Sequence, residues 1–151
     1  MTSILMVCLG NICRSPLAHG LLESKLPSDL FYVDSAGTAN YHIGDSPDQR
    51  SIAVAKTHGI DISQQQVRQF KISDFDTFDY IYVMDQSNFD NVIKLARDTD
   101  DFAKVKLILE VDTSTLDKHV PDPYYGGDSG FENVFKLLDK ATSIISQQLL
   151  S

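Results

Sequence analysis

The chain has 151 residues, 42% of them hydrophobic, and its 21 acidic side chains outnumber its 13 lysines and arginines to give a net charge of −8. A chain of this length buries about two-thirds of its unfolded surface on folding, so we expect residues 1–151 to form one domain. The negative charge argues against nucleic acid or an anionic membrane as a partner, because both attract clustered cations. No apolar run approaches the roughly 20 residues that cross a bilayer. Without a visible leader we expect a cytoplasmic protein, and export without a leader stays an open alternative.

The N-terminal segment predicts a strand, a tight loop and a helix. Residues 4–9, ILMVCL, form a short continuous apolar run, which is typical of a strand buried on both faces. Residues 16–26 repeat apolar side chains at helical spacing. Between these two segments, Gly10 and Asn11 are the residue types that most readily take left-handed backbone angles. Ser15, followed by a proline, is typical of a helix N-cap.

The rest of the chain alternates strands and helices. Further short apolar runs predict strands at 31–37, 79–85 and 105–110. Helical periods predict helices at 48–58, 86–96 and 129–149. Gly59 is expected to end the second helix, and Ser129 with Glu132 predicts a capping box at the last one, after a loop at 120–130. The alternation predicts an α/β fold with a four-stranded parallel sheet, helices on both faces, and a ligand site beyond the carboxyl ends of the strands.

Cys8 and Arg14 frame a candidate anion site at this sheet edge. A loop as short as residues 9–14 can curl around a tetrahedral oxyanion, with its amides inward and the positive end of the next helix beneath. The same field favours the thiolate of Cys8, a strong nucleophile, and the fork of Arg14 suits two phosphate oxygens. Ser15 is placed to donate a hydrogen bond to the sulfur. Together these are the parts of phosphoryl transfer through phosphocysteine. Besides Cys8 and Arg14, the predicted phosphate-binding loop contains Leu9, Gly10, Asn11, Ile12, Cys13 and Ser15.

Asp122 is the candidate general acid. Expulsion of a tyrosyl oxygen needs a proton donor, and the same group can later activate water. Pro121 and Pro123 stiffen the loop around this aspartate, and the rings of Tyr124 and Tyr125 are placed to wall a pocket deep enough for a phenyl phosphate. The four histidines, by contrast, show no metal-ligand spacing, so we expect neither a metal nor another cofactor.

These residues carry a resemblance to a known family. VCLGNICRSP, residues 7–16, resembles the signature of the low-molecular-weight protein tyrosine phosphatases. The resemblance covers essentially the whole chain and continues in family order through VDSAGT, HGI, FDYIYVMD and DPYYGGDSGFE. It implies that Cys8 is the nucleophile, Arg14 the phosphate clamp and Asp122 the general acid, and it places Tyr41 on the opposite wall of the substrate pocket. The implied partners are phosphotyrosine-containing proteins, and we expect a monomer.

Further expectations concern Gln65, Asp85, Cys13 and His19. Many family members have a histidine where this chain has Gln65, which can donate a hydrogen bond but cannot titrate. Asp85, at the end of the third predicted strand, either braces the phosphate loop or caps the next helix. Cys13 either packs under the loop or traps an oxidised Cys8 as a disulfide, which would make the enzyme redox-sensitive. His19, in the first helix, is expected at the surface.

Several other functions use a similar loop. An arsenate reductase needs further cysteines to carry electrons, and the chain has none beyond Cys13. A phosphocysteine carrier needs no hydrolytic acid, so Asp122 argues against it, and a module that only binds phosphotyrosine does not need the complete set of Cys8, Arg14 and Asp122. The nearest alternative is a phosphoarginine phosphatase. Family members with that activity tend to carry threonine where this chain has Ile12, which favours phosphotyrosine.

Overall fold

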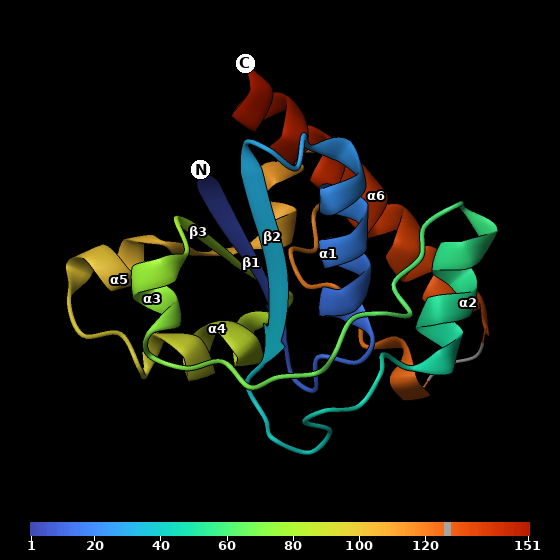
Figure 1. Ribbon diagram of the computed structural model, residues 1–151, viewed down its shortest axis with the longest axis horizontal. Helices are drawn as coiled ribbons and strands as arrows, with labels where there is room; N and C mark the ends of the chain where they lie inside the picture. The colour runs from blue at the N-terminus through green and yellow to red at the C-terminus, as the bar shows by residue number, and fades with distance from the viewer. Residues whose placement is uncertain (126–127) are drawn as a thin grey trace.

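The structure is a computed structural model that describes residues 1–125 and 128–151, without the side chains of Tyr125 and Asp128. Its strands are β1 (Thr2–Cys8), β2 (Phe31–Gly37), β3 (Tyr80–Val83) and β4 (Val105–Leu107). They form one sheet in the order β2-β1-β3-β4, and each neighbouring pair is parallel (Figure 1). The predicted α/β fold with a four-stranded parallel sheet is therefore confirmed.

Helices cover both faces of this sheet. They are α1 (Arg14–Lys25), α2 (Gln49–Thr57), α3 (Asp74–Thr77), α4 (Gln86–Ile93), α5 (Thr99–Ala103) and α6 (Asp128–Leu150). In Figure 1, α1 and α6 lie on one side of the sheet, and α3 and α4 lie on the other. Because successive side chains of a strand point to opposite faces, Ile4 and Met6 of β1 join the core beneath α1 and α6, whereas Leu5 and Val7 join the other core. All four side chains are fully buried, as the continuous apolar run predicts.

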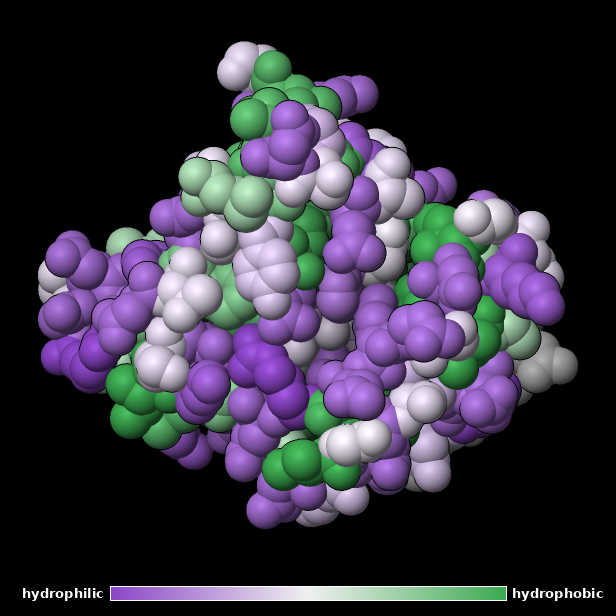
Figure 2. Space-filling model, in the orientation of Figure 1, coloured by the Kyte–Doolittle hydropathy of each residue, from purple (hydrophilic) through white to green (hydrophobic). Residues whose placement is uncertain are grey.

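The surface is mainly hydrophilic on the side that Figure 2 shows. Hydrophobic residues appear there as small separate patches among hydrophilic ones. Within residues 1–125 and 128–151, no helix combines the length and the hydropathy that a membrane crossing requires.

The fourth strand is shorter than predicted. β4 ends at Leu107, and the chain continues as a 3-10 turn, η1 (Ile108–Val111). Ile108 and Leu109 are both fully buried in the core that α6 covers. A strand would send these two neighbours to opposite faces, so the tight turn is what allows both to be buried together.

The start of the last helix also differs from the prediction. α6 begins at Asp128, so Ser129 lies inside the helix and is not its N-cap. Oε1 of Glu132 lies 2.9 Å from Nε2 of His58, at the end of α2. The predicted capping box is therefore wrong, because Glu132 contacts another helix instead of its own first turn.

Gly37 ends β2 directly beside Cys8, its register partner in β1. A Cβ at this position would lie 2.7 Å from the carbonyl oxygen of Leu9 and 3.0 Å from the amide nitrogen of Asn11. Only a residue without a side chain allows the loop after β1 to approach the end of β2 this closely.

We therefore expect Gly37→Ala to lower the free energy of unfolding by about 1–3 kcal/mol, because backbone atoms must move to accept the methyl group. Urea denaturation measures this change. Gly130→Ala in α6 is the matched control, since among the described residues the nearest atom to its Cβ would be Cβ of Pro123 at 3.8 Å. This change should leave stability unchanged or raise it by up to about 1 kcal/mol. Equal stability of Gly37→Ala and the wild type would show that the loop does not depend on this close approach.

Candidate active site

A cavity of about 190 Å³ opens at the carboxyl ends of the strands and collects most of the predicted site residues. It is lined by Cys8, Leu9, Gly10, Ile12, Cys13, Arg14, Tyr41, His42, Asp122 and Tyr124. These residues come from three separate parts of the chain: the loop between β1 and α1, the loop after β2, and the loop before α6. The side chain of Tyr125, also predicted to line the pocket, lies outside the described part of the structure. His42 was not predicted, and nothing in its sequence surroundings distinguishes it from the other histidines.

The turn of the loop after β1 depends on Asn11. Its φ of 57° places it in the left-handed region, whereas Gly10 does not adopt a positive φ. Asparagine tolerates this conformation better than most residues. The side chain is buried, where its Nδ2 donates to Oγ of Ser15 at 2.8 Å and its Oδ1 accepts from the backbone amide of Arg68 at 3.1 Å. Asn11 thus holds the loop from behind and does not line the cavity.

The carbonyl groups of the loop are held by hydrogen bonds from outside it. The carbonyl oxygens of Cys8 and Leu9 accept from the amides of Thr38 and Ala39, both at 2.9 Å. The carbonyl oxygen of Ile12 accepts from the amide of Asp48 at 2.8 Å. That of Cys13 accepts from the hydroxyl of Ser51 at 3.3 Å. The amides of Gly10, Ile12 and Cys13 donate to no residue that the structure describes. Several amides that are free to donate, in one short loop next to the start of α1, are the groups that can hold an oxyanion.

The sulfur of Cys8 lies at the base of this cradle. The amide of Asn11 donates to Sγ at 3.3 Å, and Oγ of Ser15 lies 3.0 Å from the same atom. The prediction of Ser15 as the N-cap of α1 is wrong, because the cap position is taken by Cys13, which makes no side-chain capping bond. Ser15 is fully buried, and its hydroxyl contacts Cys8 and Asn11. Its predicted contact with the sulfur is present.

Arg14 is a buried cation with a fixed orientation. Its Nη1 donates to Oδ2 of Asp85 at 2.7 Å and to the carbonyl oxygen of Val120 at 3.0 Å. Asp85 also caps α4, because its Oδ1 accepts from the amide of Asn88 at 2.9 Å, so both roles considered for Asp85 are present. Burial opposes the positive charge, but the negative charges of Cys8 and Asp85 outweigh it and raise the pKa of Arg14. The guanidinium therefore remains charged beside the cavity.

Asp122 faces Arg14 across the cavity. Its Oδ2 lies 3.9 Å from Nη2 of Arg14, and its Oδ1 accepts from the amide of Tyr124 at 3.0 Å. Arg50 fastens this loop to α2: its Nη1 donates to the carbonyl oxygen of Tyr124 at 3.1 Å, and its guanidinium lies 5.2 Å from the ring centre of Tyr124. Asp48 orients Arg50 through two hydrogen bonds of 3.0 Å. The partly exposed carboxyl of Asp122 therefore has a defined position at the cavity mouth.

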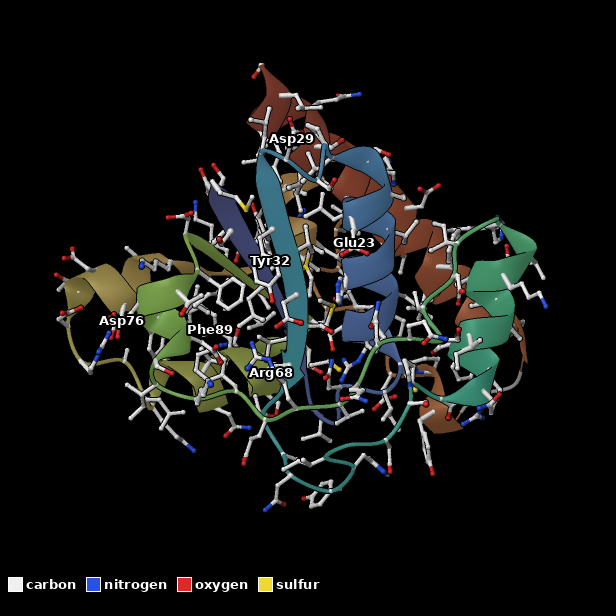
Figure 3. All side chains as sticks on the ribbon, viewed as in Figure 1. Glu23, Asp29, Tyr32, Arg68, Asp76 and Phe89 are labelled. Carbon is white, nitrogen blue, oxygen red and sulfur yellow. The ribbon has the colours of Figure 1, made fainter. Side chains whose placement is uncertain are left out.

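Arg68 supports the loop from the side of β2. Figure 3 shows Arg68 near the carboxyl end of β2. Its guanidinium donates to Asp34 at 3.1 Å and to Asp74 at 3.0 and 3.1 Å, while its backbone amide donates to Asn11. Asp74 itself is buried, and its pairing with Arg68 compensates its charge. No local sequence pattern indicates this ion-pair group, because its members are far apart in the chain.

Two further residues support α1 behind the loop. Gln65 donates from Nε2 to the carbonyl oxygen of Pro16 at 3.1 Å, as its amide allows. The prediction that His19 lies at the surface is wrong: it is buried, and its Nδ1 lies 3.0 Å from Oγ of Ser35 in β2. Its Nε2 lies 3.4 Å from a carboxylate oxygen of Glu23. The side of α1 that carries His19 packs against β2, so the ring is enclosed.

Together, these features define a class of α/β proteins that bind a tetrahedral oxyanion in a loop between a parallel strand and a helix, here with a cysteine at the base of the loop. The model of the low molecular weight phosphotyrosine protein phosphatases matches residues 3–150. The human low molecular weight phosphotyrosine protein phosphatase is 41% identical over 144 residues, which cover 89% of this chain and 87% of the human protein.

Solved structures give the same result. A protein tyrosine phosphatase from Entamoeba histolytica, with Hepes in the active site, matches with a TM-score of 0.93 and 34% identity over 99% of this chain and 97% of that one. Vibrio vulnificus Wzb in complex with benzylphosphonate matches with a TM-score of 0.87 and 28% identity over 97% and 98%. The chain therefore belongs to the low molecular weight phosphotyrosine protein phosphatase family and is a hydrolase.

The two cysteines of the loop differ in their environment. Burial, together with the nearby negative charges of Asp48 and Cys8, raises the pKa of Cys13 to about 12. At pH 7 Cys13 is therefore an uncharged thiol, and thiols react slowly with electrophiles compared with thiolates.

We expect iodoacetamide at pH 7 to label Cys8 and to leave Cys13 unmodified. Fragmentation of the labelled peptide in a mass spectrometer locates the label. Cys13→Ser should take up one label as the wild type does, whereas Cys8→Ser should take up almost none until the pH approaches 12. Prompt labelling of Cys13 in Cys8→Ser at pH 7 would contradict the raised pKa.

Proposed function

We propose that this phosphatase hydrolyses phosphotyrosine in proteins through a phosphocysteine intermediate formed on Cys8. The observation that carries the proposal is the convergence of three groups on one cavity: the sulfur of Cys8, the guanidinium of Arg14 and the carboxyl of Asp122. The amides of Gly10, Ile12 and Cys13, in the loop that follows Cys8, donate to no described residue, so they can donate to a bound phosphate. The benzylphosphonate bound by the Vibrio relative carries a phenyl ring next to a phosphonate, which is the chemistry expected of a phosphotyrosine mimic.

In the first proposed step, the loop amides and Arg14 hold the non-bridging phosphate oxygens while the thiolate of Cys8 attacks phosphorus. A sulfur–phosphorus bond forms as the bond to the tyrosyl oxygen breaks. Asp122 donates its proton to that oxygen, so the leaving group departs as neutral tyrosine. The positive field is fixed before the reaction begins, which lowers the barrier without rearrangement of the site.

In the second step, the carboxylate of Asp122 accepts a proton from a water molecule that attacks phosphorus. The sulfur–phosphorus bond breaks, inorganic phosphate leaves and the thiolate of Cys8 is restored. Ser15, 3.0 Å from the sulfur, donates a hydrogen bond that stabilises the departing thiolate. We propose no metal or other cofactor for either step, because Arg14 and the amides supply the required positive field.

The walls of the cavity suit a phenyl ring. Leu9, Ile12, Tyr41 and Tyr124 supply apolar or aromatic surface around the cradle. A phosphoserine side chain is too short to bring its phosphate from the rim of such a pocket to Cys8. We propose that the enzyme acts as a monomer on phosphotyrosine-containing proteins. Because Cys8 must stay reduced, we propose that the enzyme works in the cytoplasm.

The role of Asp122 is tested by Asp122→Ala, which should lower kcat on a phosphotyrosine peptide by about 10²–10⁴ while the peptide still binds. The wild-type rate should fall at high pH, where the acid has lost its proton, and the variant should lose this dependence. Phosphate release across a pH series measures both effects.

Two variants complete this experiment. Cys8→Ser should show no turnover and form no phosphoenzyme after a rapid acid quench. Asp117→Ala removes an exposed carboxylate from the same stretch of chain and should keep the wild-type rate. An Asp122→Ala enzyme with full activity would exclude Asp122 as the general acid, and a phosphoenzyme in Cys8→Ser would exclude Cys8 as the nucleophile.

We also propose that Cys13 protects Cys8 from oxidation. Hydrogen peroxide converts the thiolate of Cys8 to a sulfenic acid and hydroxide, and attack by the sulfur of Cys13 then forms a disulfide and releases water. Both cysteines are free thiols in the same loop.

Peroxide should therefore inactivate the wild type reversibly, with activity restored by dithiothreitol. Cys13→Ser, compared with its own untreated sample, should regain little activity, because its sulfenic acid is oxidised further. Failure to find a Cys8–Cys13 disulfide by mass spectrometry would remove this role.

A further inference from the structure

A second groove lies beside the catalytic cavity and shares two wall residues with it. Its volume is about 510 Å³. Leu9 and Tyr41 line both spaces; Leu9 is 40% exposed and Tyr41 is 73% exposed. The remaining walls come from residues 38–40 after β2, from residues 69–70 and from the C-terminal part of α4 with its following turn. A substrate whose tyrosine enters the catalytic cavity therefore has this groove beside the point where its chain leaves the cavity.

The groove carries a cation that no carboxylate neutralises. Its lining includes Lys94 and no acidic side chain. Lys94 is exposed and forms no ion pair with any residue that the structure describes, whereas all four arginines of the chain pair with carboxylates. The nearest acidic neighbours in sequence have other contacts: Asp90 accepts from Gln86, and Asp98 caps α5. In a chain with a net charge of −8, an uncompensated ammonium in a groove beside the active site is a specific place for an anionic group.

The other lining groups suit a peptide. Asn40 and Asn91 present side-chain amides that make no hydrogen bond to a described residue, so they can pair with a peptide backbone. Phe70 and Leu95 add apolar surface. A phosphate group is best bound by the two parallel hydrogen bonds of an arginine guanidinium. The groove offers a single lysine ammonium instead, which suits one carboxylate better than a phosphate.

We infer that this groove binds the segment next to the phosphotyrosine and selects substrates with an aspartate or glutamate that reaches Lys94. The inference rests on the proposed phosphotyrosine hydrolysis and names the class of protein substrate. Lys94 contributes to recognition and takes no part in the chemical steps.

The experiment uses phosphotyrosine peptides with glutamine at every flanking position, in which each position from three before to three after the phosphotyrosine is changed in turn to glutamate. The measured quantity is the ratio of kcat/KM for each glutamate peptide to that of the glutamine parent. This ratio is determined within each enzyme, so any change in basal activity cancels. The enzymes are the wild type, Lys94→Gln, Lys94→Glu and the control Lys136→Glu, which makes the same charge change on an exposed lysine of α6, across the sheet from α4.

In the wild type we expect one or two glutamate positions to raise kcat/KM about two- to fivefold, the range of a partly exposed ion pair. The preference should disappear in Lys94→Gln, reverse in Lys94→Glu and persist in Lys136→Glu. It should also weaken as salt rises, because exposed charges are screened.

Two negative results have different meanings. In the first, both the wild type and Lys94→Glu hydrolyse the phosphotyrosine peptides, and the kcat/KM ratios of glutamate to glutamine peptides are the same in the two enzymes. This result would overturn the groove inference and leave the proposed hydrolysis intact. In the second, the wild type hydrolyses neither the phosphotyrosine peptides nor a simple aryl phosphate. This result would overturn the proposed function and this inference with it.

Discussion

The outward anchoring of the loop carbonyls is the interaction on which the rest of the site depends. A peptide group is a rigid plane, so a carbonyl fixed on the outside of a loop directs its amide to the inside. Hydrogen bonds from residues 38–39, from Asp48 and from Ser51 fix four of these carbonyls. Residues 38–39 reach the end of β1 because β2 is its neighbour in the sheet, and Asp48 and Ser51 reach it because α2 packs against α1. The fold thus acts on the chemistry through backbone hydrogen bonds that no side chain of the loop provides.

The buried charge of Arg14 imposes a second requirement. A guanidinium taken out of water is stable only if its charge and its donors are compensated. Asp85 does this, and it is itself held as the N-cap of α4, so the end of β3 and the start of α1 fix one orientation of Arg14. Asp122 approaches the same guanidinium from a third part of the chain. A bound phosphate would meet a positive field that is already oriented, and reorganisation would cost little.

Sequence patterns identified the parts of this structure that are local. The apolar runs predicted β1 and β2, and the spacing of Cys8 and Arg14 predicted an anion loop that the cavity brings together with Asp122. What could not be predicted depends on contacts between distant segments. The burial of His19 requires β2 beside α1, and the role of Arg68 requires partners many residues away. Likewise, β4 ends early because Ile108 and Leu109 are both buried in the same core, and the local apolar pattern does not indicate on which side of the sheet they lie.

A chain with a net charge of −8 repels anions at long range, so the attraction for a phosphate group must come from the site itself. Each arginine is paired with a carboxylate, so the arginines give little long-range attraction for a phosphoprotein. Backbone amides, however, present positive partial charge without adding to the net charge of the chain. Concentrating the attraction in the loop is compatible with a net charge of −8 for the whole chain. Binding then requires a group small enough to enter the cradle, so selection among anions comes from the shape of the cavity more than from total charge.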